Sequence, residues 1–175
     1  MSLTTHTLTL LRHAKSDWGF EGLTDRQRPL NARGERDAPE MGKRLKASGV
    51  RPSLIVCSSA VRTTQTAKLF AKAIGFPIEF IHREASLYLA SAHGILKTIA
   101  EHDNDFKNIV LVGHNPGISE VAEQLSDGLT DHLPTAAMLT VRADVPDWQS
   151  FAFGAIDVVS YDFPKNADGP ITRRS

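Results

Sequence analysis

The sequence is poor in cysteine, with Cys57 as the single one among 175 residues. No internal disulfide can form, and this cysteine usage is typical of a reducing cytoplasm. No stretch approaches the ~20 consecutive apolar residues of a membrane-spanning helix. Residues 1–6 lack the basic patch and the apolar segment of a signal peptide. We therefore expect a soluble, cytoplasmic protein in which Cys57 is a small buried side chain.

The chain also lacks an excess of charge of either sign. Its 20 Lys and Arg residues balance 20 Asp and Glu residues, so we expect neither nucleic-acid binding nor membrane binding. Any preference for an anion must then come from a local cluster of side chains. The 7 histidines show no HxH, HxxxH or HExxH spacing, so neither a metal ion nor another cofactor is expected.

Apolar periodicity in the sequence predicts an α/β fold. The expected strands span 7–11, 53–57, 77–81, 108–113, 137–142 and 151–159, and the expected helices span 32–48, 61–74, 92–102 and 118–125. This alternation is typical of a three-layer α/β/α sandwich with a mostly parallel central sheet. The last two strands should form a hairpin. The length suits a single domain, predicted at 1–163, followed by a flexible C-terminal tail at 164–175.

Polar side chains follow three of the predicted strands. Arg12 and His13 come directly after the first strand, and His114 follows the fourth. Arg62 lies in the first turn of the helix after the second strand, where free backbone N–H groups favour an anion. Because the carboxyl ends of parallel strands share one edge of a sheet, we expect these four residues to meet in one pocket. The polar loop at 17–30 is either a border of that pocket or a plain connector.

Two arginines and two histidines around one point suit a dianionic phosphoryl group better than a cation. Arginine binds phosphate through paired, charge-assisted hydrogen bonds. A histidine nitrogen can serve as a nucleophile, an acid or a ligand. As a nucleophile it attacks phosphorus in line and forms a phosphohistidine that water later hydrolyses, while the arginines and the second, protonated histidine hold the charge. None of these steps needs a metal ion.

Three motifs resemble the signature blocks of the histidine phosphatase superfamily, which has the phosphoglycerate mutase-like fold. Leu10-Leu11-Arg12-His13-Ala14-Lys15-Ser16 is similar to the Arg-His-Gly block of that family, with Ala14 in place of the usual glycine. The segment 58–67 places an arginine before a Thr-rich helix start, as the second block does. Gly113-His114-Asn115-Pro116-Gly117 is similar to the third block. The motifs follow one another in the order of the family.

Within that superfamily the chain resembles the SixA-type phosphohistidine phosphatases, through its short length and through Arg28-Pro29-Leu30-Asn31 followed by Gly34. The resemblance implies that His13 is the nucleophile. It implies that Arg12 and Arg62 clamp the phosphate and that His114 is the second histidine of the pocket. Ser16 falls where relatives often place a hydroxyl or amide near the phosphate, although a local loop cap is an equal alternative.

The sequence leaves open which residue, if any, is the general acid. Relatives that act on alcohol phosphates carry a Glu or Asp after the third strand, where Glu84 lies. Glu84 is therefore either the acid or a surface carboxylate, and Asp17 and His93 are weaker substitutes. A protonated imidazole has a pKa near 6.5 and leaves far more easily than an alkoxide, so a phosphohistidine phosphatase can manage without an acid.

The sequence favours a cofactor-independent phosphatase that forms a phosphohistidine on His13 and acts on phosphohistidine in a protein. A phosphatase of sugar phosphates or other small metabolites, with Glu84 as its acid, is the alternative among enzymes. A phosphoprotein-binding module without turnover is the alternative of another class. The expected partner is thus a phosphorylated protein or a small phosphorylated metabolite, and the sequence leaves the oligomeric state open.

Overall fold

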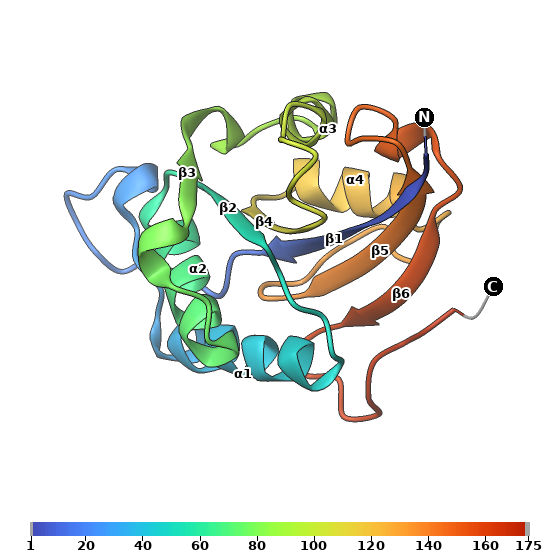
Figure 1. Ribbon diagram of the computed structural model, residues 1–175. Helices are drawn as coiled ribbons and strands as arrows, with labels where there is room; N and C mark the ends of the chain where they lie inside the picture. The colour runs from blue at the N-terminus through green and yellow to red at the C-terminus, as the bar shows by residue number, and fades with distance from the viewer. Residues whose placement is uncertain (1, 174–175) are drawn as a thin grey trace.

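The central sheet has six strands in the order β3-β2-β4-β1-β5-β6 (Figure 1). The computed structural model describes residues 2–173. The strands are β1 (Thr4–Arg12), β2 (Leu54–Ser58), β3 (His82–Glu84), β4 (Asn108–Gly113), β5 (Met138–Val145) and β6 (Asp157–Asp162). The first four in the sheet order are parallel to one another, whereas β5 is antiparallel to both β1 and β6. The predicted mostly parallel sheet is confirmed.

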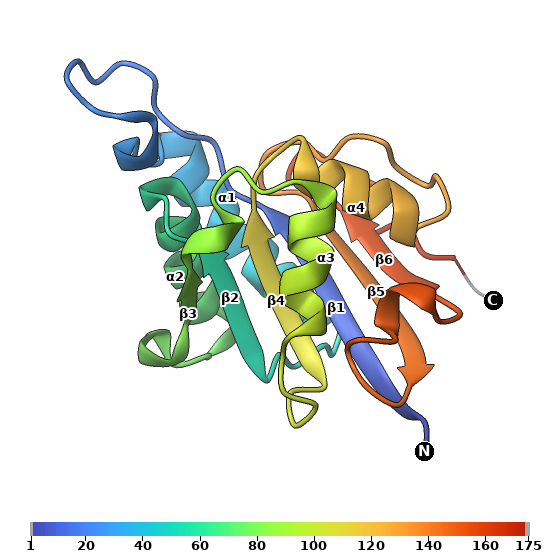
Figure 2. The same cartoon turned by 90° about the horizontal axis from the view of Figure 1, so that it is seen from above.

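Helices cover both faces of the sheet. In Figures 1 and 2, α1 (Ala32–Ala47) and α2 (Val61–Ile74) lie on one face, and α3 (Ala92–Ala100) and α4 (Gly117–Leu125) lie on the other. The strands carry apolar side chains on both sides because each side of the sheet is buried. This arrangement confirms the three-layer α/β/α prediction.

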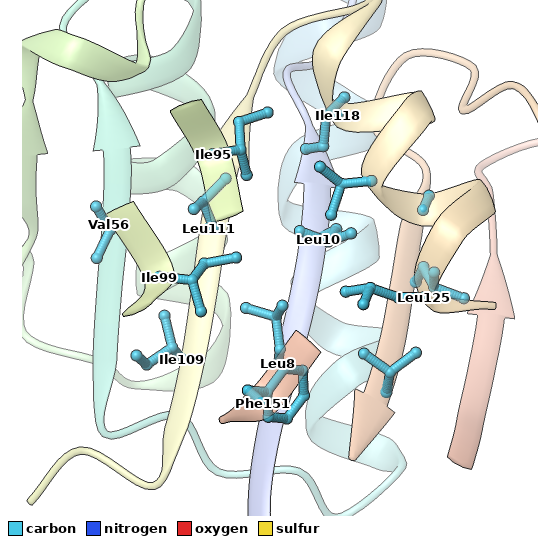
Figure 3. Packing of buried hydrophobic residues seen from close by; sticks show 14 of the residues in the cluster. Leu8, Leu10, Val56, Ile95, Ile99, Ile109, Leu111, Ile118, Leu125 and Phe151 are labelled. Atoms are coloured by element: carbon cyan, nitrogen blue, oxygen red, sulfur yellow. The ribbon is translucent and has the colours of Figure 1, made fainter. Parts of the chain in front are cut away.

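The alternation of side chains along β1 and β4 divides the core into two clusters. Leu8 and Leu10 of β1 pack toward α3 and α4, whereas Leu11 packs toward α1 and α2. On β4, Leu111 and Val112 divide in the same way. Figure 3 shows the cluster on the side of α3 and α4, in which Leu8, Leu10 and Leu111 pack together with Ile95, Ile99, Ile118, Leu125 and Phe151. The two central strands are thereby fixed from both faces, which fixes the position of their carboxyl ends.

Helix termini follow the local signals in the sequence. Asn31 caps α1 by accepting a hydrogen bond from the Gly34 amide, and Ser91 caps α3 by accepting one from the Gly94 amide. Helix α2 ends at Gly75, whose φ of 77° is the left-handed conformation that glycine adopts most easily. The predicted helices 32–48 and 61–74 are therefore confirmed to within a residue at each end.

The prediction of a strand at 77–81 is wrong. Ile78–Phe80 forms a 3-10 turn instead, closed by a hydrogen bond from the Phe80 amide to the Pro77 carbonyl, and β3 follows it at His82–Glu84. The segment lies at the edge of the sheet, where Ile78 and Phe80 are exposed. Apolar alternation predicts a strand only where one face of that strand is buried, and here it is not.

The strand predicted at 151–159 begins too early. Phe151–Phe153 is a 3-10 turn, and β6 starts at Asp157. Phe151 leaves the strand register because its ring packs on Trp148, with ring centroids 5.0 Å apart. The predicted pairing of the last two strands is nevertheless confirmed, since β5 and β6 are antiparallel neighbours.

The segment after β6 returns to the sheet. Ile171 and Tyr161 exchange two backbone hydrogen bonds of 2.8 and 2.7 Å. Arg44 of α1 donates hydrogen bonds to the carbonyls of Phe163 and Pro164. The limit of the domain at residue 163 and the flexibility of the segment after it stay predictions. Within residues 2–173, no helix has both the length and the apolar character needed to cross a membrane.

Gly34 is required where α1 approaches the end of β1. A Cβ atom at this position would lie 2.2 Å from the Lys15 carbonyl oxygen, well inside van der Waals contact. That carbonyl also accepts a hydrogen bond of 3.0 Å from the Asn31 amide. The start of α1 is therefore held directly against the turn that follows His13.

We expect Gly34→Ala to lower the free energy of unfolding by about 1 to 3 kcal/mol, because the added methyl group must displace the Lys15 backbone. Gly94→Ala is the matched control, since a Cβ there meets nothing closer than 3.5 Å. The control should be as stable as the wild type or slightly more stable, because alanine favours helix. Urea unfolding measures both variants. Equal stability of the two variants would refute the close contact.

Candidate active site

Three strand ends bring the predicted residues together. Arg12 ends β1 beside Gly113 of β4, and the His13 amide donates a hydrogen bond to the Gly113 carbonyl. His114 follows directly, and its ring centroid lies 5.5 Å from that of His13. Arg62 reaches the same point from the first turn of α2. Figure 2 shows β1, β2 and β4 with their carboxyl ends at one edge of the sheet.

These residues line a cavity of about 190 Å³. Its full lining consists of Arg12, His13, Lys15, Ser16, Trp18, Arg28, Arg62, Leu89, His114, Asn115 and Thr135. A larger cavity of about 550 Å³ lies between α1 and the end of β6 and shares no lining residue with the smaller one. Convergent cationic groups and shifted histidine pKa values mark the smaller cavity as the candidate active site.

His13 is held as a neutral imidazole. Its Nδ1 lies 2.8 Å from the Ala14 carbonyl, which can only accept, so Nδ1 carries the hydrogen and Nε2 keeps its lone pair. Burial lowers the pKa of His13 to about 3, with the Ala14 hydrogen bond opposing and the charges of His114, Arg62 and Arg12 adding to the effect. At neutral pH the Nε2 lone pair is therefore available for nucleophilic attack.

Both arginines are tethered to a backbone carbonyl through Nη1. Arg12 donates from Nη1 to the Leu133 carbonyl at 3.0 Å, and Arg62 donates from Nη1 to the Asp25 carbonyl at 2.8 Å. The Nε atom of each arginine is buried and has no partner among residues 2–173. A buried N–H group without a partner costs free energy that a ligand oxygen would recover. The pair is thus arranged to receive an anion.

His114 also has a buried ring nitrogen without a hydrogen-bond partner in the described part of the chain. Its Nε2 lies 2.7 Å from the Ser58 hydroxyl, while its buried Nδ1 has no partner in the described part of the chain. Burial, followed by the charge of Arg62, lowers the pKa of His114 to about 4. A bound dianion would oppose this shift and favour the protonated ring.

Ser16 is placed at the cavity but is already engaged. Its hydroxyl accepts a hydrogen bond of 2.7 Å from Nη1 of Arg28. Arg28 also stacks on the Trp18 ring, with its guanidinium carbon 3.5 Å from the ring centroid. Sequence reasoning did not assign Arg28, Lys15 or Trp18 to the site. Their place in the loop predicted at 17–30, or directly before it, was the available signal.

Asp25 is the carboxylate nearest to the candidate clamp, and sequence reasoning missed it. Oδ2 accepts hydrogen bonds from Nη2 of Arg62 at 3.1 Å and from the Tyr88 hydroxyl at 2.5 Å. Arg28 lies 3.0 Å from Oδ1. The hydrogen bond from Tyr88, followed by those from the two arginines, lowers the pKa of Asp25 to about 2. Asp25 is therefore ionised at neutral pH and holds Arg62 in place rather than donating a proton.

The predicted acid residues lie outside the cavity. Glu84 accepts hydrogen bonds from the Ser86 hydroxyl and amide, which lower its pKa, and it lies 3.5 Å from His82. Asp17 accepts a hydrogen bond from the Gly19 amide. His93 lies on α3 beside a separate groove. Among residues 2–173, no group of three or more His, Cys, Asp or Glu side chains could hold a metal ion.

Comparisons with known proteins match this chain to one family. A family model described as histidine phosphatase superfamily (branch 1) matches residues 8–106. An uncharacterized chloroplastic protein of Arabidopsis thaliana is 35% identical over 150 residues, which cover 81% of this chain and 68% of that protein.

Solved structures show the same fold. SixA from Nakamurella multipartitia has a TM-score of 0.78 at 23% identity, covering 95% of this chain and all of that one. SixA from Agrobacterium tumefaciens has a TM-score of 0.69 at 29% identity, covering 78% of this chain and 90% of that one. The phosphoglycerate mutase-like fold predicted from the motifs is thereby confirmed.

The shifted pKa of His114 predicts a specific loss of stability in acid. Because its folded pKa of about 4 lies below the unfolded value near 6.5, the unfolded chain binds the extra proton between these values. Stability therefore falls as the pH drops through this window. We expect the free energy of unfolding to fall by about 2 kcal/mol more in the wild type than in His114→Gln between pH 7 and pH 5.

Urea unfolding at the two pH values measures this difference. His93→Gln is the control, because His93 is exposed on α3. The control should lose as much stability as the wild type does. An identical pH dependence of His114→Gln and the wild type would contradict the lowered pKa.

Proposed function

The chain belongs to the histidine phosphatase superfamily, branch 1, and from that membership and the pocket geometry we propose that it is a phosphatase of phosphohistidine in proteins. The reaction runs through a covalent phosphohistidine on His13. Arg12, Arg62 and His114 bind the phosphoryl oxygens, and Ser16 supports the site through Arg28. The solved protein histidine phosphatase SixA with bound tungstate, at a TM-score of 0.74, supports an oxyanion in this fold.

The observation that carries this proposal is the state of the carboxylates. The cavity lining contains no Asp or Glu among residues 2–173. Asp25 and Glu84, which lie outside that lining, both have lowered pKa values and are ionised at neutral pH. An alkoxide leaving group needs a proton donor, whereas an imidazole protonated on its distal nitrogen departs as a neutral molecule. The site therefore favours a phosphoramidate over an alcohol phosphate.

The proposed reaction has two steps, and in each one N–P bond breaks as a new bond to phosphorus forms. Nε2 of His13 attacks phosphorus, the N–P bond of the substrate breaks, and the substrate ring leaves as neutral imidazole. Because Nδ1 of His13 keeps its hydrogen on the Ala14 carbonyl, the phosphorylated His13 is in turn a neutral leaving group. Water then attacks phosphorus, the N–P bond to His13 breaks, and the protons of water pass to inorganic phosphate and solvent.

The proposal also sets what we expect of the partner, the cofactors and the cellular compartment. We expect a phosphorylated protein as the partner and no metal or other cofactor in the reaction. The single cysteine still favours the cytoplasm, although the relative from Arabidopsis thaliana is described as chloroplastic.

His13→Ala should abolish turnover, because no other imidazole in the site has a free lone pair tethered in this way. The measurement is rapid-quench trapping with ³²P-labelled phosphoramidate, in which the wild type should carry an acid-labile, base-stable label and His13→Ala none. His93→Ala is the control and should be labelled as the wild type is. A wild type that binds phosphate without forming a labelled enzyme would instead be a phosphoprotein-binding module.

Glu84→Gln separates the two enzyme hypotheses. We expect kcat/KM on free phosphohistidine to stay within about twofold of the wild type, because the leaving imidazole needs no acid. If Glu84 were the general acid of a metabolite phosphatase, an alkyl phosphate would be the better substrate. Its kcat/KM would then fall by about 10²- to 10⁴-fold in the variant. Steady-state kinetics on both substrates decides between these outcomes.

A further inference from the structure

The segment between Trp18 and Asp25 carries large apolar side chains in solvent. Trp18 is 74% exposed, Phe20 is 56% exposed and Leu23 is 40% exposed. Figures 1 and 2 both show this segment, in blue, standing away from the body of the protein. Clustered exposed apolar side chains of this size commonly mark a contact surface. We call Trp18, Phe20 and Leu23 the apolar tip.

Both ends of the segment are fixed at the cavity. At one end, Trp18 lines the cavity and lies under the guanidinium group of Arg28. At the other end, Asp25 holds Arg62. The base of the loop is closed by a hydrogen bond of 2.8 Å from the Asp17 amide to the Pro29 carbonyl. The apolar tip therefore stands beside the mouth of the cavity.

The cavity leaves most of a substrate outside it. At about 190 Å³ it is smaller than the roughly 300 to 1,000 Å³ of clefts that enclose a small molecule. Its lining carries the cations Arg12, Lys15, Arg28 and Arg62, although the whole chain has no net charge. The cavity is thus complementary to a phosphoryl group and its immediate attachment, and the rest of the substrate must meet the rim.

We propose that the apolar tip is a docking surface for the protein substrate, and that it selects phosphohistidines surrounded by exposed apolar residues. This inference rests on the proposed function and adds the character of the substrate surface. The phosphoryl group binds the cationic cavity while the apolar neighbours of the phosphohistidine pack on Phe20 and Leu23. A small metabolite would reach the cavity without touching Phe20 or Leu23, because neither lines it.

Two synthetic peptides test the inference. Each peptide carries one phosphohistidine with a glycine on either side. Beyond each glycine, one peptide has two leucines and the other has two serines. Free phosphohistidine is the third substrate. The enzymes are the wild type, Phe20→Ser/Leu23→Ser, and the control Phe153→Ser. Phe153 is 91% exposed. It lies in the segment after β5, and the end of β5 pairs with the start of β1. This is the edge of the sheet opposite the carboxyl ends of the parallel strands.

The wild type should hydrolyse the leucine peptide with a kcat/KM about tenfold above that of the serine peptide, as expected for a few buried apolar contacts. The double variant should lose this preference, and Phe153→Ser should keep it. All three enzymes should hydrolyse free phosphohistidine equally, because neither Phe20 nor Leu23 lines the cavity. That last measurement also shows that the double variant is folded and active.

Two results would overturn the docking surface alone. One is equal kcat/KM for the two peptides in a wild type that hydrolyses both. The other is a leucine preference that survives the double substitution. A wild-type dimer in sedimentation that becomes monomeric in the double variant, with peptide preference unchanged, would assign the tip to self-association instead. Failure to hydrolyse any phosphohistidine compound would refute the proposed function, and the docking surface with it.

Discussion

The candidate active site depends on keeping the imidazole ring of one histidine neutral beside two guanidinium groups. His13 meets this constraint because it is buried at the end of a central strand and donates its single N–H group to the backbone. The cost of burying a charge then acts against protonation and leaves Nε2 free. Each neighbouring arginine is likewise fixed by a backbone carbonyl, from Leu133 or from Asp25. The cations are thus positioned before any anion arrives, which lowers the reorganisation required on binding.

The sequence predicts the part of the site that lies on the parallel strands. Arg12, His13 and His114 follow apolar runs that are fully buried in the sheet, and parallel strands place their carboxyl ends together. The position of Arg62 follows from the adjacent strand and helix by the same rule. Periodicity failed at two places for different reasons. At 77–81 the chain runs along an exposed edge of the sheet, so no face of a strand is buried there. At 151–153 Phe151 is buried, but its ring packs on Trp148 outside any strand.

Three further groups at or beside the site come from a loop without periodicity. Arg28, Trp18 and Asp25 are brought to the cavity by stacking and ion pairing between residues of one loop, and by a hydrogen bond to Tyr88 from a distant segment. Such contacts depend on side-chain geometry, which no spacing rule encodes. Glu84 shows the converse limit. Its place in the chain matches the expected acid, but its carboxylate is bound by Ser86.

Among the described residues 2–173, the cavity lining has no Asp or Glu that could act as a carboxylic acid toward the leaving group, and this links the architecture to selectivity. An enzyme that supplies no proton to the leaving group must select substrates by the stability of the departing group. Imidazole meets that condition and an alkoxide does not. Affinity for the phosphoryl group alone cannot distinguish one phosphorylated protein from another, because every such group makes the same bonds to the arginines. For the protein substrate proposed above, discrimination must therefore come from contacts beside the cavity, where this chain carries the exposed apolar side chains of the 17–30 loop.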